Sequence, residues 1–127
     1  MLVLKVRAGK LESSGQWVYA WIASDGVVYV GATEVHPETR TWLHLHDDDP
    51  NVGRMRARFP GLAGEDLDVL ALELPAGVDR QQVRHGAVAQ LAERGALSDR
   101  QVCDPPSLAA PHPETDRFVE AIEARLQ

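Results

Sequence analysis

Residues 17–33 read WVYAWIASDGVVYVGAT, and this stretch decides the fold. Aromatic and β-branched residues fill residues 17–22 and 27–32, and Asp25-Gly26 lies between the two runs. Such residues favour strands, and Asp-Gly favours a tight turn. The stretch therefore predicts an antiparallel hairpin.

The length of the hairpin loop decides where the two tyrosines lie, because side chains alternate between the faces of a strand. A two- or four-residue loop around Asp25-Gly26 would pair Tyr29 with Ile22 and send the phenols of Tyr19 and Tyr29 to opposite faces. A three-residue loop over residues 24–26 would pair Tyr29 with Trp21 and place both phenols on one face. We predict the three-residue loop.

Two glycines fit this register. Gly26 would take the left-handed position of a type I turn followed by a G1 bulge. Gly31 would lie opposite Tyr19, where the missing side chain lets a ligand approach the sheet. We therefore expect the shared tyrosine face to be open at Gly31.

A helix is predicted over residues 37–46, because Pro37 suits a first helical position. Arg40 and His44 are four residues apart and project from one face of this helix. Arg can clamp a phosphate with two hydrogen bonds, and Tyr or His can relay a proton. The side chains of Tyr19, Tyr29, Arg40 and His44 are predicted to converge. The structural alternative is that the tyrosines only pack and that the Arg–His pair is solvated.

The remaining sequence predicts elements that complete a small α/β (α+β) domain. These are a strand over 2–7, a loop over 9–15, a helix from Asp49-Pro50 to Pro60-Gly61, a buried strand over 67–74, a helix from Asp79 to Gly95 and a helix over 114–126. Asp79 followed by Gln82 is a capping-box pattern at the start of the fifth of these segments. We expect a domain over residues 1–103, a Pro-rich linker over 104–113 and a C-terminal amphipathic helix over 114–127. Phe118, Val119, Ile122 and Leu126 would pack that helix on the domain or on a homodimer or protein partner.

Composition limits the function. The chain has 127 residues, enough for one domain, and a net charge of −6. A negative surface opposes nucleic-acid binding unless a basic patch offsets it locally. No apolar run is long enough to span a membrane, and a single cysteine, Cys103, excludes an internal disulfide. We expect a cytoplasmic protein.

The order of these motifs resembles the GIY-YIG nuclease superfamily over residues 17–95. Tyr19 matches the tyrosine of the first motif, although the local sequence is WVYA. Tyr29-Val30-Gly31 is a good version of the second motif. Arg40 lies where the helix arginine is expected, and His44 follows one turn later.

The resemblance implies a three-stranded antiparallel sheet flanked by helices. It also implies hydrolysis of phosphodiester bonds in nucleic acid, with DNA as the expected substrate and Mg²⁺ or Mn²⁺ as the metal. Tyr19 and Tyr29 would position or deprotonate water, Arg40 would clamp the phosphate and His44 would assist proton transfer. The alternative is a catalytically inactive module of the same fold that binds nucleic acid or a protein partner.

The resemblance fails at the metal-binding glutamate of the family. Arg84 or His85 holds the matching place in this chain, and a hard cation such as Mg²⁺ prefers carboxylate oxygens. Glu73 is the nearest substitute by sequence, and His85 would suit a transition metal. Alternatively, Glu73 is a solvated carboxylate or pairs with Arg80.

Other patterns offer further candidates. Arg54, Arg56 and Arg58 form one dense basic cluster, which predicts either a solvated helix face or, together with Gly31, a nucleic-acid contact. Residues 44–49 (HLHDDD) favour a solvated turn over a metal site, because the two histidines point apart on a helix. The three tryptophans are expected to pack, with base stacking as the alternative: Trp17, Trp21 and Trp42.

Overall fold

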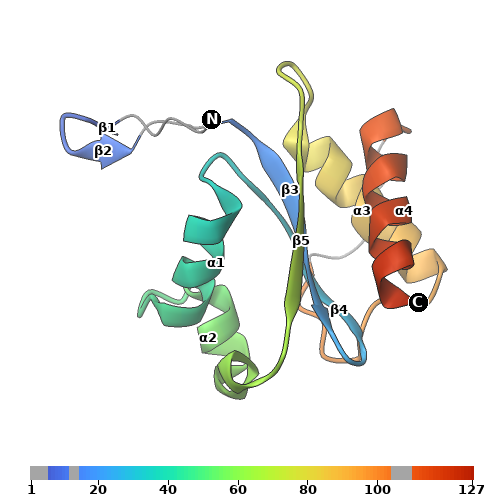
Figure 1. Cartoon of the computed structure of the whole chain (residues 1–127), viewed down its shortest axis with the longest axis horizontal. Helices are drawn as coiled ribbons and strands as arrows, with labels where there is room; N and C mark the ends of the chain where they lie inside the picture. Colours follow the sequence, from blue (N-terminus) through green and yellow to red (C-terminus); the bar gives the residue numbers. More distant parts are fainter. Residues whose placement is uncertain (1–5, 12–14, 104–109) are drawn as a thin grey trace.

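The computed structural model describes residues 6–11, 15–103 and 110–127. These residues form a mixed α/β fold with a three-stranded antiparallel sheet, a two-stranded hairpin and four helices (Figure 1). The elements are β1 (Val6–Arg7), β2 (Lys10–Leu11), β3 (Trp17–Ala23), β4 (Gly26–Thr33), α1 (Pro37–His46), α2 (Arg54–Arg58), a 3₁₀ helix (Pro60–Gly64), β5 (Asp68–Glu73), α3 (Arg80–Glu93) and α4 (Pro113–Leu126). The expected antiparallel sheet flanked by helices is confirmed. Within the described ranges, no helix combines the length and apolar character needed to cross a membrane.

The β3–β4 hairpin has the predicted tyrosine register. Tyr19 pairs with Gly31 and Trp21 pairs with Tyr29, so both phenols lie on one face of the sheet. Strand β3 is the centre of the order β4-β3-β5, and all seven of its side chains are buried. The two phenols therefore share a face, as predicted, and one of them, Tyr19, belongs to the central, fully buried strand β3.

The turn that produces this register is not the predicted one. Ala23 pairs with Gly26, so the loop has two residues, and the register shifts between Trp21 and Ile22. Val28 is the extra residue on β4, and this bulge restores the alignment of the tyrosines that a regular two-residue loop would lose. The predicted three-residue loop with a G1 bulge at Gly26 is wrong because the bulge lies two residues further along the chain.

Helices cover both faces of the sheet (Figure 1). Val18, Ala20 and Ile22 face the apolar core that contains α3 and α4. Tyr19 and Trp21 lie in a second cluster that includes Met55 of α2. In Figure 1, α1 and α2 lie on one side of the sheet and α3 and α4 on the other. The tyrosine face is therefore the face that α1 and α2 cover.

Three predicted elements need correction. Residues 2–5 of the expected N-terminal strand lie outside the described residues, and Val6–Arg7 pairs with Lys10–Leu11, a short strand inside the segment predicted to be a loop. The second helix begins at Arg54, because residues 47–53 form turns. Strand β5 is half-exposed, since it pairs with β3 on one side only and is an edge of the sheet.

Helices α3 and α4 agree with their sequence signals. The Asp79 side chain accepts hydrogen bonds from the backbone N–H groups of Gln81 and Gln82, which caps α3. The side-chain amide nitrogen of Gln82 donates to the carbonyl oxygen of Ala110, which ties α3 to the segment before α4. The apolar face of α4, formed by Phe118, Val119 and Ile122, is buried against the sheet and α3. The expected packing of this helix on the domain is confirmed for these three residues, whereas Leu126 is exposed.

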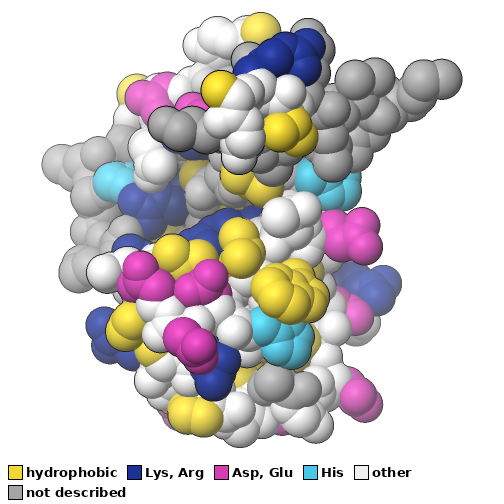
Figure 2. Space-filling view, turned by 90° about the vertical axis from the view of Figure 1, so that its left-hand side faces the viewer, with side chains coloured by type: hydrophobic (Ala, Val, Ile, Leu, Met, Phe, Trp, Pro, Cys, Tyr) yellow, Lys and Arg dark blue, Asp and Glu magenta, His cyan; other side chains and the backbone are white. Residues whose placement is uncertain are grey.

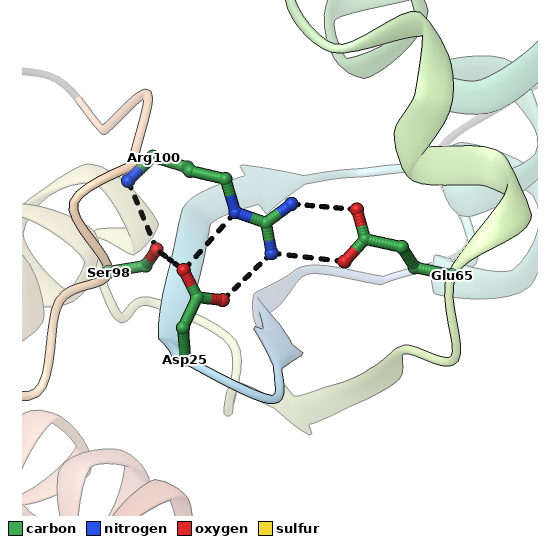
Figure 3. A network of polar contacts seen from close by, with 4 residues as sticks. All are labelled: Asp25, Glu65, Ser98 and Arg100. Carbon is green, nitrogen blue, oxygen red and sulfur yellow. Dashed lines mark hydrogen bonds and ion pairs between the residues drawn. The ribbon is translucent and has the colours of Figure 1, made fainter.

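A network of four polar side chains closes the turn end of the hairpin (Figure 3). The Arg100 guanidinium donates to both carboxylate oxygens of Asp25 and to both of Glu65. Ser98 donates to Asp25 and accepts from the backbone N–H of Arg100. The guanidinium thereby joins the hairpin loop, the residue after the 3₁₀ helix and the segment after α3.

Candidate functional site

Helix α1 delivers His44 to the tyrosine face. Pro37 begins the helix, and the ring of His36 accepts a hydrogen bond from the backbone N–H of Glu38. His44 is fully buried, and its ring centroid lies 5.8 Å from that of Tyr19 and 5.1 Å from that of Tyr29. The predicted gathering of the two phenols and the imidazole is therefore present.

A hydrogen bond of 2.7 Å joins the Tyr19 hydroxyl to Nε2 of His44. Nδ1 of His44 has no hydrogen-bond partner among the described residues, and neither does the indole nitrogen of Trp21. If Nε2 accepts from Tyr19, Nδ1 carries the proton and is an unsatisfied buried donor. If Nε2 donates, the Tyr19 proton is left to another acceptor. The tautomer of His44 therefore decides which way the Tyr19 hydroxyl points its hydrogen.

Both partners of this hydrogen bond are held neutral near pH 7. Burial lowers the pKa of His44 to about 3, and the positive charges of Arg40 and Arg54 act in the same direction. Burial is also the main reason that the pKa of Tyr19 is raised above its usual value, with Tyr29 adding to the effect and Arg40 opposing it. A histidine with so low a pKa is a weak base, and such a tyrosine releases its proton reluctantly.

Gly31 makes room for Tyr19 itself. A Cβ atom at position 31 would overlap the hydroxyl and ring of Tyr19 and lie 2.8 Å from a ring carbon of Tyr29. Gly31 is also buried. The space predicted for an approaching ligand is therefore filled by the phenol, and the glycine is needed for packing.

A cleft of about 220 Å³ opens beside these rings. It is lined by Tyr19, Tyr29, Ala32, Arg40, Asn51, Arg54, Gln81 and Arg84. Figure 2 shows the face of the molecule that carries α1 and α2, with Lys and Arg side chains recessed between its upper and lower parts. The lining contains three arginines and no Asp or Glu. The cleft therefore favours an anion.

Hydrogen bonds orient two of the cleft arginines. Arg40 donates from Nη1 to the carbonyl oxygen of Val52 at 2.9 Å, and Arg54 donates from Nη1 to the Tyr29 hydroxyl at 3.4 Å. Neither forms an ion pair with a carboxylate of the described residues. Each guanidinium keeps further N–H groups for an incoming acceptor.

Two amide side chains of the cleft, Asn51 and Gln81, escaped the sequence analysis. Asn51 lies in the turn after α1, where its backbone N–H donates to Asp49. Gln81 lies in the first turn of α3, after the Asp79 cap, and its carbonyl oxygen accepts from Nε of Arg84. The turn at Asp49 and the helix cap at Asp79 can be recognised in the sequence. Neither signal indicates that the side chains of Asn51 and Gln81 line the same cleft.

The three arginines of α2 do not act as one patch. Arg54 lines the cleft, and Arg58 lines an adjoining hollow with Tyr29. Arg56 turns away, donates to the carbonyl oxygen of His46 and pairs with Asp48 at 2.8 Å. The predicted nucleic-acid contact at Arg56 therefore loses its geometric basis, since side chains two positions apart on a helix do not share a face.

Two of the three tryptophans are packed inside, as predicted, and the third is exposed. Trp17 and Trp21 are buried, with Trp21 edge-on to His44 at a centroid distance of 5.5 Å. Trp42 is 59% exposed and contacts the ring of His46. The expectation that Trp42 packs inside is wrong, because positions 42 and 46 lie on the side of α1 away from Arg40 and His44.

The residues proposed as metal ligands do not meet at the cleft. Glu73 lines a different hollow, at the end of β5, with Glu34 and Gln16. Nε2 of His85 is 2.7 Å from Nη2 of Arg84. Arg80 pairs with Glu34 instead of Glu73. Among the described residues, no group of three or more His, Cys, Asp or Glu side chains is placed to hold a metal ion, residues 44–49 included.

The cleft therefore does not fit a hard divalent cation. Mg²⁺ and Mn²⁺ need oxygen ligands, chiefly carboxylates, and the lining supplies neutral phenols, amides and guanidinium groups. Arg84 and Gln81 lie where α3 meets the cleft, the region to which the resemblance assigns a glutamate. A cationic side chain there repels a metal ion.

Comparison of the chain with protein-family models, with curated proteins and with solved structures found no match. The functional argument therefore depends on the residues of the cleft and their geometry.

Proposed function

We propose that this chain is a GIY-YIG-like module that binds a phosphate group of nucleic acid in the cleft and does not hydrolyse it by the one-metal route. The observation that carries the proposal is a cleft with Arg40, Arg54 and two phenols and no carboxylate in its lining. Phosphate oxygens are the acceptors that guanidinium groups bind best.

The pairing of arginines elsewhere supports this assignment. Arg40 and Arg54 have no carboxylate partner in the described part of the chain. Six other arginines do have one: Arg56, Arg80, Arg94, Arg100, Arg117 and Arg125. In a chain with 19 acidic residues, unpaired guanidinium groups beside a recess are a local exception. An external anion is the partner that the cleft lacks.

Neutral donors complete the proposed phosphate site. The Tyr29 hydroxyl and the amide of Asn51 line the same cleft as the arginines. Both can donate to phosphate oxygens without adding charge. Since the chain carries a net charge of −6, binding of an anion is local and depends on few contacts.

Hydrolysis lacks a strong base in this arrangement. A general base works best with a pKa near the working pH, whereas burial lowers the pKa of His44 to about 3. Tyr19 is neutral and hydrogen-bonded to that histidine. The pair is better suited to hold the cleft wall in place than to activate water.

A metal-dependent nuclease is the second candidate. The hydrogen bond between Tyr19 and His44, within the same site as Arg40, favours it, because phenol, imidazole and guanidinium are the groups that the GIY-YIG resemblance assigns to catalysis. Cleavage of single-stranded, duplex and branched DNA and of RNA, with Mg²⁺, Mn²⁺ or EDTA, separates the two candidates. We expect no cleavage above that of an Arg40→Ala, Tyr29→Phe double variant. Metal-dependent cleavage that the double variant lacks would establish the nuclease.

The binding proposal is tested by fluorescence anisotropy with a labelled 20-nucleotide single strand at low salt. Arg54→Gln should weaken binding by about tenfold or more, because a hydrogen bond to a charged group is worth about 1.5–3 kcal/mol. Arg56→Gln, on the same helix but paired with Asp48, is the matched control and should bind as the natural chain does. Equal affinities for the two variants, or no binding by the natural chain, would contradict the proposal.

A further inference from the structure

A second hollow of about 190 Å³ adjoins the cleft. It is lined by Tyr29, Pro50, Asn51, Arg54, Arg58 and Val102. Tyr29, Asn51 and Arg54 line both spaces, so the two share a wall. Arg58 is exposed and has no carboxylate partner among the described residues, as is true of Arg54.

We propose that this hollow binds the neighbouring phosphate of the same strand, so that the protein takes two consecutive phosphates of a single strand with Arg54 between them. The proposal rests on the proposed function of the cleft and adds that the ligand is a single strand contacted at two consecutive phosphates. Arg40 and Arg54 would hold the first phosphate, and Arg54 and Arg58 the second. Pro50 and Val102 give the second space an apolar wall, which suits the sugar between two phosphates.

The helical spacing of α2 supports a track with two sites. Arg54 and Arg58 are four residues apart and project from one side of α2, whereas Arg56 lies on the other side and pairs with Asp48. The track therefore uses the two arginines of this helix that pair with no carboxylate in the described part of the chain.

Acidic side chains limit the track to a short length. Asp47, Asp48 and Asp49 immediately precede Pro50 and Asn51, which line the hollow. A longer strand, or the second strand of a duplex, would bring further phosphates against these carboxylates. The arrangement therefore favours a short contact with one flexible strand.

Salt dependence gives a quantitative expectation. For single strands the slope of log K against log salt concentration is about −0.7 for each phosphate neutralised, so two phosphates predict about −1.4. Arg58→Gln should reduce the slope to about −0.7, the value for a single phosphate. Arg56→Gln is the matched control and should keep the natural slope.

NMR titration with thymidine oligonucleotides that contain one, two and four phosphodiesters tests the proposal directly, because it measures weak affinities. In the natural chain, affinity should rise about fivefold to tenfold from one phosphate to two and little from two to four. Arg58→Gln should remove the first rise, so that the two-phosphate probe binds no more tightly than the one-phosphate probe, whereas Arg56→Gln should keep the rise.

Each outcome has a definite meaning. An Arg58→Gln variant that matches Arg56→Gln, or an affinity that keeps rising through four phosphates, overturns the two-phosphate track. Either result leaves the cleft proposal intact if Arg54→Gln still weakens binding of the 20-nucleotide strand. Failure of that strand to bind at all overturns both proposals.

Discussion

Two regions along the same hairpin use arginine in opposite ways. At the turn end, Arg100 lies between the carboxylates of Asp25 and Glu65, and its charge is used within the chain (Figure 3). Toward the open end, Arg40 donates to the backbone carbonyl of Val52 and Arg54 donates to the Tyr29 hydroxyl, and neither pairs with a carboxylate of the described residues. The Arg100 guanidinium joins three segments of the chain, and those of Arg40 and Arg54 keep N–H groups for an external acceptor.

The difference shows that the arrangement of partners decides the role of a charged side chain more than its type does. Hydrogen bonds to Asp25 and Glu65 raise the pKa of Arg100, and those to Arg100 and Ser98 lower the pKa of Asp25. Beside the cleft, the same positive charge acts on a buried imidazole and helps to lower the pKa of His44. The network is a structural contact, whereas two cleft arginines, Arg40 and Arg54, have no carboxylate partner among the described residues.

The largest expected effect comes from filling the space that Tyr19 uses. Gly31→Ala would place a methyl group against the Tyr19 phenol and should destabilise the protein by about 3 kcal/mol, because a packed core accommodates extra atoms poorly. Urea unfolding measures the change. Gly61→Ala is the control, since a Cβ there meets nothing within 4 Å. Equal stabilities of the two variants would show that the tyrosine wall is loosely packed.

Next in size is the loss of the buried hydrogen bond. Tyr19→Phe leaves Nε2 of His44 unsatisfied in the interior and should cost about 1–3 kcal/mol in the free energy of unfolding. Tyr29→Phe removes only a 3.4 Å contact with Arg54 and should cost less than about 1 kcal/mol. Chemical denaturation of both variants gives the comparison. A larger loss of stability in Tyr29→Phe than in Tyr19→Phe would contradict the assignment of the structural hydrogen bond to Tyr19.

A smaller effect is expected from pH. The folded chain protonates His44 near pH 3, whereas the unfolded chain does so near its ordinary value of 6.5. The unfolded state therefore binds more protons between these values, and stability falls as the pH falls through that window. From pH 7 to 5.5 the loss should be about 1 kcal/mol. His44→Gln should lack this part of the loss in urea unfolding at the two pH values, and an equal loss in both proteins would contradict the assignment.

The smallest effect concerns the network. In Arg100→Gln the pKa of the Asp25 carboxyl should rise back toward its ordinary value, because the guanidinium hydrogen bonds are its main cause of lowering. The natural chain should lose the contribution of this network as the pH falls below the ordinary Asp value of 3.8, and the variant should lose less. NMR titration of Asp25 measures the shift. Nucleic-acid affinity should not change, and a change would mean that the two regions are coupled.

The sequence by itself determined the hairpin, the first helix, the cap at Asp79 and the sharing of one face by Tyr19 and Tyr29. These features follow from local rules, namely strand alternation, the 3.6-residue helical period and the chemistry of caps and turns. Residues 17–33 carry enough of them to predict the sheet. Arg40 and His44 followed because a helix fixes which positions share a side.

Only the tertiary structure decided what surrounds those residues. The bulge at Val28 corrects a two-residue loop, which no local pattern indicated. Asn51 and Gln81 reach the cleft because α1 and α3 come to it from distant parts of the chain. The separation of Arg56 from Arg54, and of Glu73 from the cleft, likewise depends on packing between elements. Charge and shape at a site are long-range properties, so a sequence pattern can name the residues but cannot say which of them meet.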